Sequence, residues 1–131
     1  MKLSIIIPTY NEENTIVDVV NRIDATCFPI ECEIIIVDDV SIDSTFEKQT
    51  QISFKNERNG KYDIRLFRNR LNKGKSFSVR KGIRQSRGDF IIVQDGDDKY
   101  DPQEIPKLLE PVLKGEADVV CESRFLSSHL S

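Results

Sequence analysis

Short runs of β-branched residues alternate along this chain with stretches whose apolar residues recur every three or four positions. Continuous apolar runs are typical of strands buried on both faces of a parallel sheet, and the longer spacing is typical of amphipathic helices. The pattern predicts strands at residues 3–7, 33–37, 62–67, 90–93 and 118–121. It predicts helices at residues 11–23, 44–51, 75–86 and 101–115.

Several polar residues set the expected helix ends. Asn11 is a candidate cap for the first helix, with Glu12 and Glu13 in a first turn that favours negative charge. Pro106 and Pro111 lie inside the fourth helical pattern and predict a kink or a division into two helices.

Alternating strands and helices predict an α/β fold, Rossmann-like, with a mainly parallel sheet and helices on both faces. The expected strand order is 3-2-1-4-5. Ligands of such sheets bind outside the carboxyl ends of the strands, where the strand order reverses. Polar residues follow three of the strands, at 8–12, 38–39 and 95–98, and we expect them to converge on one site.

The composition adds limits to this picture. A length of 131 residues, 38% of them hydrophobic, predicts a single globular domain over residues 1–131. Three cysteines without a CxxC pair suit reduced thiols in the cytoplasm, and a single histidine argues against structural zinc. No apolar run reaches the roughly 18 residues of a membrane span. We expect no nucleic-acid partner.

Asp95-Gly96-Asp97 directly follows a buried strand and is the strongest candidate for a metal site. Carboxylates are the ligands that Mg²⁺ and Mn²⁺ prefer, together with substrate phosphates. The alternative is a solvated acidic turn. An EF-hand is excluded, because Lys99 occupies the fifth loop position and no glycine follows it.

Basic residues cluster in the middle of the chain, where 12 of the 19 lysines and arginines lie between Lys55 and Arg87. Gly74-Lys75-Ser76 is similar to the end of a P-loop, but Asn69 replaces the first glycine of that motif. Asn72 and Lys75 are better candidates for supplying positive potential beside an anionic ligand, or else they belong to a solvated basic face.

Asp38 and Asp39 have two interpretations that the sequence leaves open. They could accept hydrogen bonds from a nucleobase or ribose, or supply negative charge at the N-terminus of the nearby helix predicted at residues 44–51. Tyr10 could stack on a base or cover the edge of the sheet.

These motifs together resemble glycosyltransferase family two, which has the GT-A fold. The resemblance is carried by residues 4–13, 37–45, 72–75 and 87–98. Residues 99–102 and 117–125 are similar to its branch of dolichyl-phosphate mannose synthases and bacterial polyprenyl-phosphate glycosyltransferases.

The resemblance implies an inverting transfer of a sugar from a nucleotide-sugar donor, such as GDP-mannose or UDP-glucose, to an acceptor that would be a polyprenyl phosphate. It implies Mg²⁺ or Mn²⁺ bound by Asp95 and Asp97, with Asp97 and Arg124 as the catalytic residues. The implied donor-binding residues are Pro8, Thr9, Tyr10, Glu12, Val37, Asp38, Asp39, Asn72, Lys75, Gln94, Asp95, Gly96, Asp97 and Arg124. The alternative is a non-catalytic nucleotide-sugar-binding or regulatory fragment.

Three residues depart from the family pattern. Val40 replaces a glycine, Glu122 replaces another glycine before Ser123-Arg124, and Lys99 stands where a further metal ligand is common. Family members are also longer, so we expect the acceptor-binding half and any membrane helices to be absent, with a membrane subunit as a potential partner. The expected location is the cytoplasm, and peripheral attachment to the cytoplasmic membrane face is left open.

Overall fold

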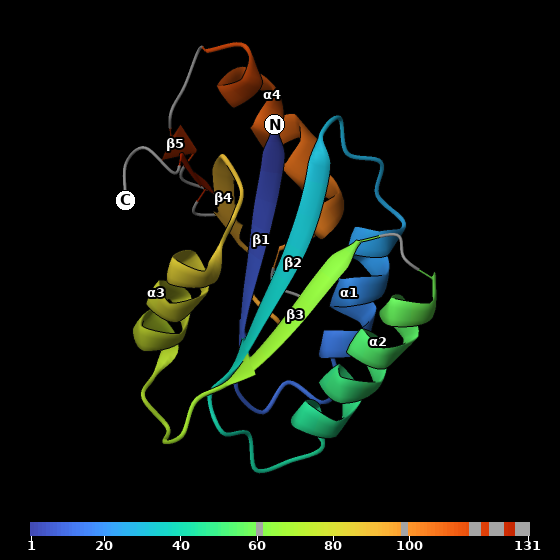
Figure 1. Cartoon of the computed structure of the whole chain (residues 1–131), viewed down its shortest axis with the longest axis vertical. Helices are drawn as coiled ribbons and strands as arrows, with labels where there is room; N and C mark the ends of the chain where they lie inside the picture. Colours follow the sequence, from blue (N-terminus) through green and yellow to red (C-terminus); the bar gives the residue numbers. More distant parts are fainter. Residues whose placement is uncertain (60–61, 98–99, 116–118, 121–124, 128–131) are drawn as a thin grey trace.

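The strands form one sheet in the order β3-β2-β1-β4-β6-β5 (Figure 1). The computed structural model describes residues 1–59, 62–97, 100–115, 119–120 and 125–127. The strands are β1 (Lys2–Thr9), β2 (Glu31–Asp38), β3 (Asp63–Arg68), β4 (Phe90–Val93), β5 (Val119–Val120) and β6 (Phe125–Ser127). The first four are parallel to one another, as the sequence predicted, while β6 is antiparallel to both β4 and β5.

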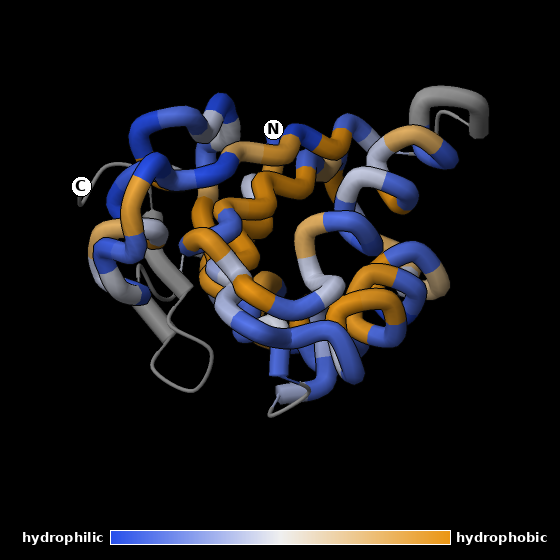
Figure 2. The backbone as a smooth tube through the Cα atoms, turned by 90° about the horizontal axis from the view of Figure 1, so that it is seen from below, coloured by the Kyte–Doolittle hydropathy of each residue, from blue (hydrophilic) through white to orange (hydrophobic). Residues whose placement is uncertain are grey.

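The helices lie on both faces of the sheet, as expected, and Figure 2 shows the apolar strands between them. They are α1 (Ile16–Asp24), α2 (Thr45–Asn59), α3 (Lys75–Gln85) and α4 (Ile105–Leu113), with a short 3₁₀ helix at Pro102–Glu104. The segment predicted as one helix at 101–115 thus begins with a separate 3₁₀ helix, which agrees with the alternative of a division into two helices. Asp101 begins this segment, and its carboxylate accepts a hydrogen bond from the Gln103 amide at 3.0 Å.

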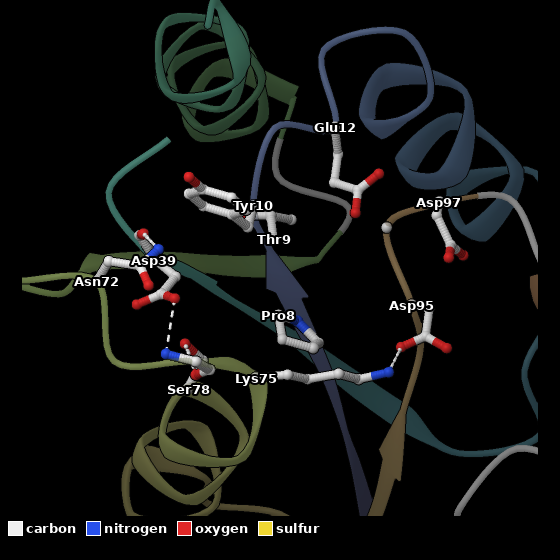
Figure 3. Close-up of a pocket in the computed structure, with 12 residues that line it drawn as sticks. Pro8, Thr9, Tyr10, Glu12, Asp39, Asn72, Lys75, Ser78, Asp95 and Asp97 are labelled. Atoms are coloured by element: carbon white, nitrogen blue, oxygen red, sulfur yellow. Dashed lines mark hydrogen bonds and ion pairs between the residues drawn. The ribbon is translucent and has the colours of Figure 1, made fainter. Parts of the chain in front are cut away.

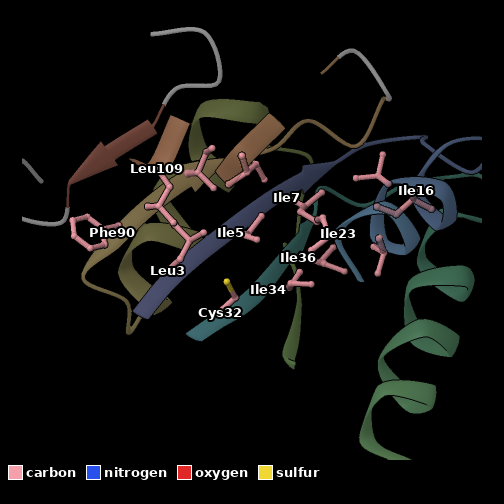
Figure 4. Close-up of a cluster of buried hydrophobic side chains, with 14 of the residues drawn as sticks. Leu3, Ile5, Ile7, Ile16, Ile23, Cys32, Ile34, Ile36, Phe90 and Leu109 are labelled. Atoms are coloured by element: carbon pink, nitrogen blue, oxygen red, sulfur yellow. The ribbon is translucent and has the colours of Figure 1, made fainter. Parts of the chain in front are cut away.

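Two apolar clusters hold the layers together, one on each face of the sheet. Strand β1 is buried from Leu3 to Thr9, and its side chains alternate between the two clusters. The larger cluster packs β1, β2 and β4 against α1 and α4 (Figure 4). The smaller cluster includes Ile6, Ile35, Val37 and Ile91, and Ile83 of α3 packs against it. Burial on both faces is the reason that these strands are continuously apolar.

Helix α1 begins at Ile16, five residues later than the predicted cap at Asn11. Asn11 has a left-handed backbone, with φ of 52°, and therefore cannot begin a helix. Its side chain instead accepts a hydrogen bond from the amide of Ile42 at 3.0 Å. The prediction of a cap at Asn11 was wrong because this contact with a distant loop takes the side chain away from the helix.

Two further elements differ from the predicted pattern. Helix α2 continues to Asn59, well beyond the predicted end. The extension was missed because Ile52 and Phe54 are the only apolar residues in its last eight positions, which therefore give no helical apolar stripe. The strand predicted at 118–121 is β5, but it does not pair with β4. The unpredicted β6 lies between them, and its three residues are too few to give a periodic signal.

Within the described residues, no helix combines the length and the apolar character needed to cross a bilayer.

Candidate functional site

A cavity of about 390 Å³ lies at the carboxyl ends of β1, β2 and β4 (Figure 3). Its volume falls within the usual range of small-molecule sites. The cavity lies where the strand order reverses: β2 and β3 are found beside β1 toward one edge of the sheet, and β6 and β5 are found beside β4 toward the other edge. This is the position expected for ligands of such sheets. The lining residues are Pro8, Thr9, Tyr10, Glu12, Asp39, Asn72, Gly74, Lys75, Ser78, Asp95, Gly96 and Asp97.

The structure thus brings together ten of the residues that the sequence singled out for donor binding. Val37, Asp38 and Gln94 are buried and do not line the cavity. Val37 packs in the smaller apolar cluster, and Asp38 accepts hydrogen bonds from the hydroxyl and amide of Ser41 at 2.6 and 3.0 Å. Arg124 lies outside the described residues, as do Lys99 and Glu122.

Asp39 holds the loop that precedes α3. Its carboxylate accepts hydrogen bonds from the amides of Lys73 and Gly74 and from the Asn69 side chain, each at 2.8 Å. Burial would raise the pKa of Asp39, but these hydrogen bonds outweigh it and the net shift is downward. Asp39 is therefore an ionised anchor at the N-terminus of α3, a place that favours negative charge. The sequence offered Asp39 as a charge for the N-terminus of the second helix, α2, whereas its hydrogen bonds go to the amides at the N-terminus of α3.

Three carboxylates line the opposite side of the cavity from this loop. Asp95 and Asp97 extend from the end of β4, and Glu12 faces them from the β1–α1 loop (Figure 3). Asp95 also forms an ion pair with the ammonium of Lys75, which reaches across from the first turn of α3. Positive and negative groups thus meet inside the cavity.

The pKa of Glu12 is raised above its ordinary value. Burial contributes most, followed by the negative charge of Asp97, while a hydrogen bond from Thr15 acts in the opposite direction. The negative charges of Asp97 and Asp95 therefore act on Glu12 in the same direction as its burial.

The donor groups fit a hard divalent cation such as Mg²⁺ or Mn²⁺. Asp95 and Asp97 offer carboxylate oxygens, and Asp95 already attracts one cation, the Lys75 ammonium. In the part of the chain that the structure describes, no three acidic, cysteine or histidine residues could hold a metal ion by themselves. Two carboxylates are a common protein contribution to a Mg²⁺ site whose other ligands are substrate phosphates.

Val40 adopts the left-handed backbone conformation that the missing glycine would favour. Its φ is 61°, which is unfavourable for a β-branched residue. Val40 follows Asp39 directly, so the strained residue adjoins the anchor of the α3 loop.

Gly74 and Ser78 line the cavity but were absent from the sequence prediction. The Ser78 hydroxyl accepts a hydrogen bond from the Asn69 side chain at 3.0 Å. A signal was present for Ser78, because Ser78 and Gly82 are four residues apart and mark a face of α3 with small, buried side chains.

Comparisons with known proteins agree with this architecture. The chain is 37% identical over 126 residues to a dolichol-phosphate mannosyltransferase from Pyrococcus furiosus. The aligned region covers 96% of this chain and 34% of that protein. The structure is similar to S. aureus TarS residues 1–349 in complex with UDP-GlcNAc, with a TM-score of 0.73, 28% identity and coverage of 90% and 33% of the two chains.

A mannosyltransferase from Pyrobaculum calidifontis, solved with GDP-Man and Mn²⁺, has the same fold, with a TM-score of 0.66. It is 22% identical and covers 78% of this chain and 29% of that one. The chain spans about a third of the length of the curated relatives it matches.

The model of glycosyl transferase family 2 matches residues 4–129, nearly the whole chain. This match agrees with the strand order, with the cavity at the carboxyl ends of the strands and with the acidic pair after β4. The chain therefore belongs to glycosyl transferase family 2.

Proposed function

We propose that the cavity binds a nucleotide sugar together with a divalent cation, as the donor site of an inverting glycosyltransferase. The observation that carries the proposal is the convergence of Tyr10, Glu12, Asp95 and Asp97 on one cavity of suitable volume. A donor of the GDP-mannose or UDP-glucose type fits the proposal, because its diphosphate would supply the remaining metal ligands.

Asp95 and Asp97 would hold the cation, which acts as a Lewis acid on the diphosphate leaving group when bound. Lys75 is placed to add positive charge beside the same phosphates, since its ammonium lies within the cavity against Asp95. Tyr10 is about half exposed at the cavity and offers a ring face on which a base can stack.

The proposed acceptor is a polyprenyl phosphate, in line with the name of the Pyrococcus relative. A phosphate acceptor is already an anionic nucleophile, so its attack on the anomeric carbon requires no group to remove a proton. The proposed transfer therefore requires this chain to bind the donor and to stabilise the leaving group. Arg124 is proposed as a further phosphate contact on the strength of its motif.

Donor binding is testable with the 131-residue chain. A thermal-shift panel of nucleotide sugars, with and without Mn²⁺, would identify the donor, since a ligand stabilises the state it binds. We expect Asp97→Asn to weaken Mn²⁺-dependent binding of that donor by at least about tenfold in calorimetry, because a metal ligand loses its charge.

Asp63→Asn is the matched control, since Asp63 is exposed at the start of β3 and does not line the cavity. Equal donor affinity of Asp97→Asn and the unmodified chain would refute the metal assignment. Donor binding without transfer to a polyprenyl phosphate would instead favour a non-catalytic donor-binding unit.

A further inference from the structure

The ammonium group of Lys75 contacts a carboxylate oxygen that a metal ion would also use. Lys75 is the first residue of α3, and it forms an ion pair with Oδ1 of Asp95, which lies two residues after the end of β4. In Figure 3 the stem of Lys75 extends from α3 toward Asp95 across the cavity. Asp95 is one of the two carboxylates that would hold the divalent cation, so one side chain has two candidate positive partners.

The ammonium and a divalent cation compete for this carboxylate. A cation bound to Asp95 through either oxygen would lie beside the Lys75 ammonium, and like charges repel each other strongly at such short range. The side chain of Asp95 is only 16% exposed, so water and salt screen this repulsion less than at an open surface. Binding of a metal ion at Asp95 therefore requires the ammonium to move.

The backbone of Lys75 is held in place, whereas its ammonium can move. Gly74 has a φ of 93°, which residues with a side chain rarely adopt, and its amide donates a hydrogen bond to Asp39 at 2.8 Å. The Gly74 carbonyl accepts one from the Ser78 amide at 3.2 Å. The flexible four-carbon stem of Lys75 begins at this fixed point, and the side chain is 44% exposed. Rotation of the stem can therefore carry the ammonium away from Asp95 without a change in the loop.

A bound anion is the natural second partner of this ammonium. Asp39 also lines the cavity, but its carboxylate already accepts three hydrogen bonds from residues 69–74. It has little capacity left to receive Lys75 as well. Phosphates that enter the same cavity would offer charged oxygens to the ammonium and attract it away from Asp95.

We propose that Lys75 is an internal counter-ion of Asp95, which competes with the divalent cation and is transferred to the phosphates when the donor binds. The cation would then bind weakly to the donor-free chain and more tightly once the donor is present. Because coupling between two ligands is reciprocal, the donor would also bind more weakly without the cation. The competition rests on the ion pair alone, whereas the transfer to the phosphates rests on the proposed function.

The competition is tested with Mn²⁺ alone. In calorimetric titrations of the 131-residue chain without nucleotide, Lys75→Met should bind Mn²⁺ about fivefold more tightly than the unmodified chain, from the usual strength of a partly exposed ion pair. Methionine keeps an unbranched apolar side chain and removes the charge. Lys75→Arg keeps the positive charge and should show no gain in Mn²⁺ affinity.

Lys73→Met is the matched control for a general effect of charge. Lys73 is exposed on the same loop, and its side chain does not line the cavity. The control removes the same charge two positions away, and we expect it to change the Mn²⁺ affinity by less than about twofold, because solvent screens an exposed charge. Circular dichroism would show that every variant is folded.

The transfer to the phosphates is tested by repeating the Mn²⁺ titrations with saturating GDP and with saturating UDP. The nucleotide that binds should tighten Mn²⁺ binding in the unmodified chain. In Lys75→Met the factor of this tightening should be about fivefold smaller, because no ammonium has to leave Asp95.

Unchanged or undetectable Mn²⁺ affinity in Lys75→Met, or an equal gain in Lys73→Met, would overturn the competition and show that the ion pair only joins α3 to the end of β4. An equal effect of nucleotide in the unmodified chain and in Lys75→Met would overturn the transfer. Failure of both nucleotides to bind, alongside the gain in Mn²⁺ affinity of Lys75→Met, would refute the proposed function and the transfer with it, and would leave the competition standing.

Discussion

Asp39 illustrates how single residues in this site serve structure and chemistry together. Its carboxylate lies on the cavity surface, yet its hydrogen bonds go to Asn69 and to the amides of Lys73 and Gly74. These contacts fix the loop from which Asn72 and Lys75 reach the cavity. Val40, the next residue, carries backbone strain in the same turn.

Replacing Val40 by glycine should stabilise the protein. A left-handed backbone costs a residue with a side chain about 1–2 kcal/mol, and the greater freedom of unfolded glycine offsets part of the gain. We expect the free energy of unfolding of Val40→Gly to rise by about 1 kcal/mol in urea denaturation. Val17→Gly, an exposed position in α1, should lower it instead. A loss of stability in Val40→Gly would show that the side chain contributes more than the strain costs.

Helix α3 approaches the sheet closely because its inner face lacks large side chains. A Cβ at Gly82 would lie 2.5 Å from Cγ2 of Ile6 in β1. The turn that follows α3 is tighter, since a Cβ at Gly88 would lie 2.8 Å from the Ser4 amide nitrogen and 2.9 Å from the Lys2 carbonyl oxygen. Side chains can adjust by rotation, whereas paired strands cannot move apart easily.

The two glycines should therefore differ in their tolerance of alanine. We expect Gly82→Ala to lower the free energy of unfolding by about 1–2 kcal/mol, since overpacking exceeds the gain in helix propensity. Gly88→Ala should cost more, because its clash is with backbone atoms. Ser76→Ala on the exposed face of α3 provides the control and should change stability by a few tenths of a kcal/mol at most. Thermal unfolding of the three variants gives the order directly, and the reverse order of the glycine variants would contradict this account.

On the scale of the whole molecule, a buried charge joins the β1, β2 and β3 strands to the end of α3. Glu33 of β2 is fully buried and accepts hydrogen bonds from the Ser4 hydroxyl and the Arg87 amide, both at 2.6 Å. Arg65 of β3 forms an ion pair with it at 3.1 Å. Burial alone would raise the pKa of Glu33, but these partners outweigh it and the pKa lies below the ordinary value of 4.5.

This shift makes stability depend on pH in a defined direction. Because the folded pKa is lowered, the contribution of Glu33 is complete above about 4.5 and is lost as the pH falls through the folded pKa. Glu33→Gln should lower the free energy of unfolding by about 2 kcal/mol at neutral pH, through weaker hydrogen bonds. Its stability should then fall less steeply toward acid than that of the unmodified chain. Parallel acid-dependence curves from urea denaturation would show that Glu33 does not contribute to the pH dependence.

The sequence by itself determined the layered α/β architecture and the edge at which the site lies. Phe90–Val93 is a strand with the predicted bounds because a short β-branched run has few alternatives in a parallel sheet. Topology then brings the ends of β1, β2 and β4 together, so Tyr10, Asp39 and Asp95 could be placed at one cavity from their order alone.

Tertiary structure decided what each of these residues does there. Three contacts join residues 20 to 35 positions apart: the ion pair of Lys75 with Asp95, the hydrogen bond from Gly74 to Asp39, and the hydrogen bond from Ile42 to Asn11. The last of these accompanies the late start of α1. Such contacts depend on loop conformations and on side chains from neighbouring elements. Hydrophobic periodicity reports which face of an element is buried, and it contains no information on which distant polar group a loop residue will meet.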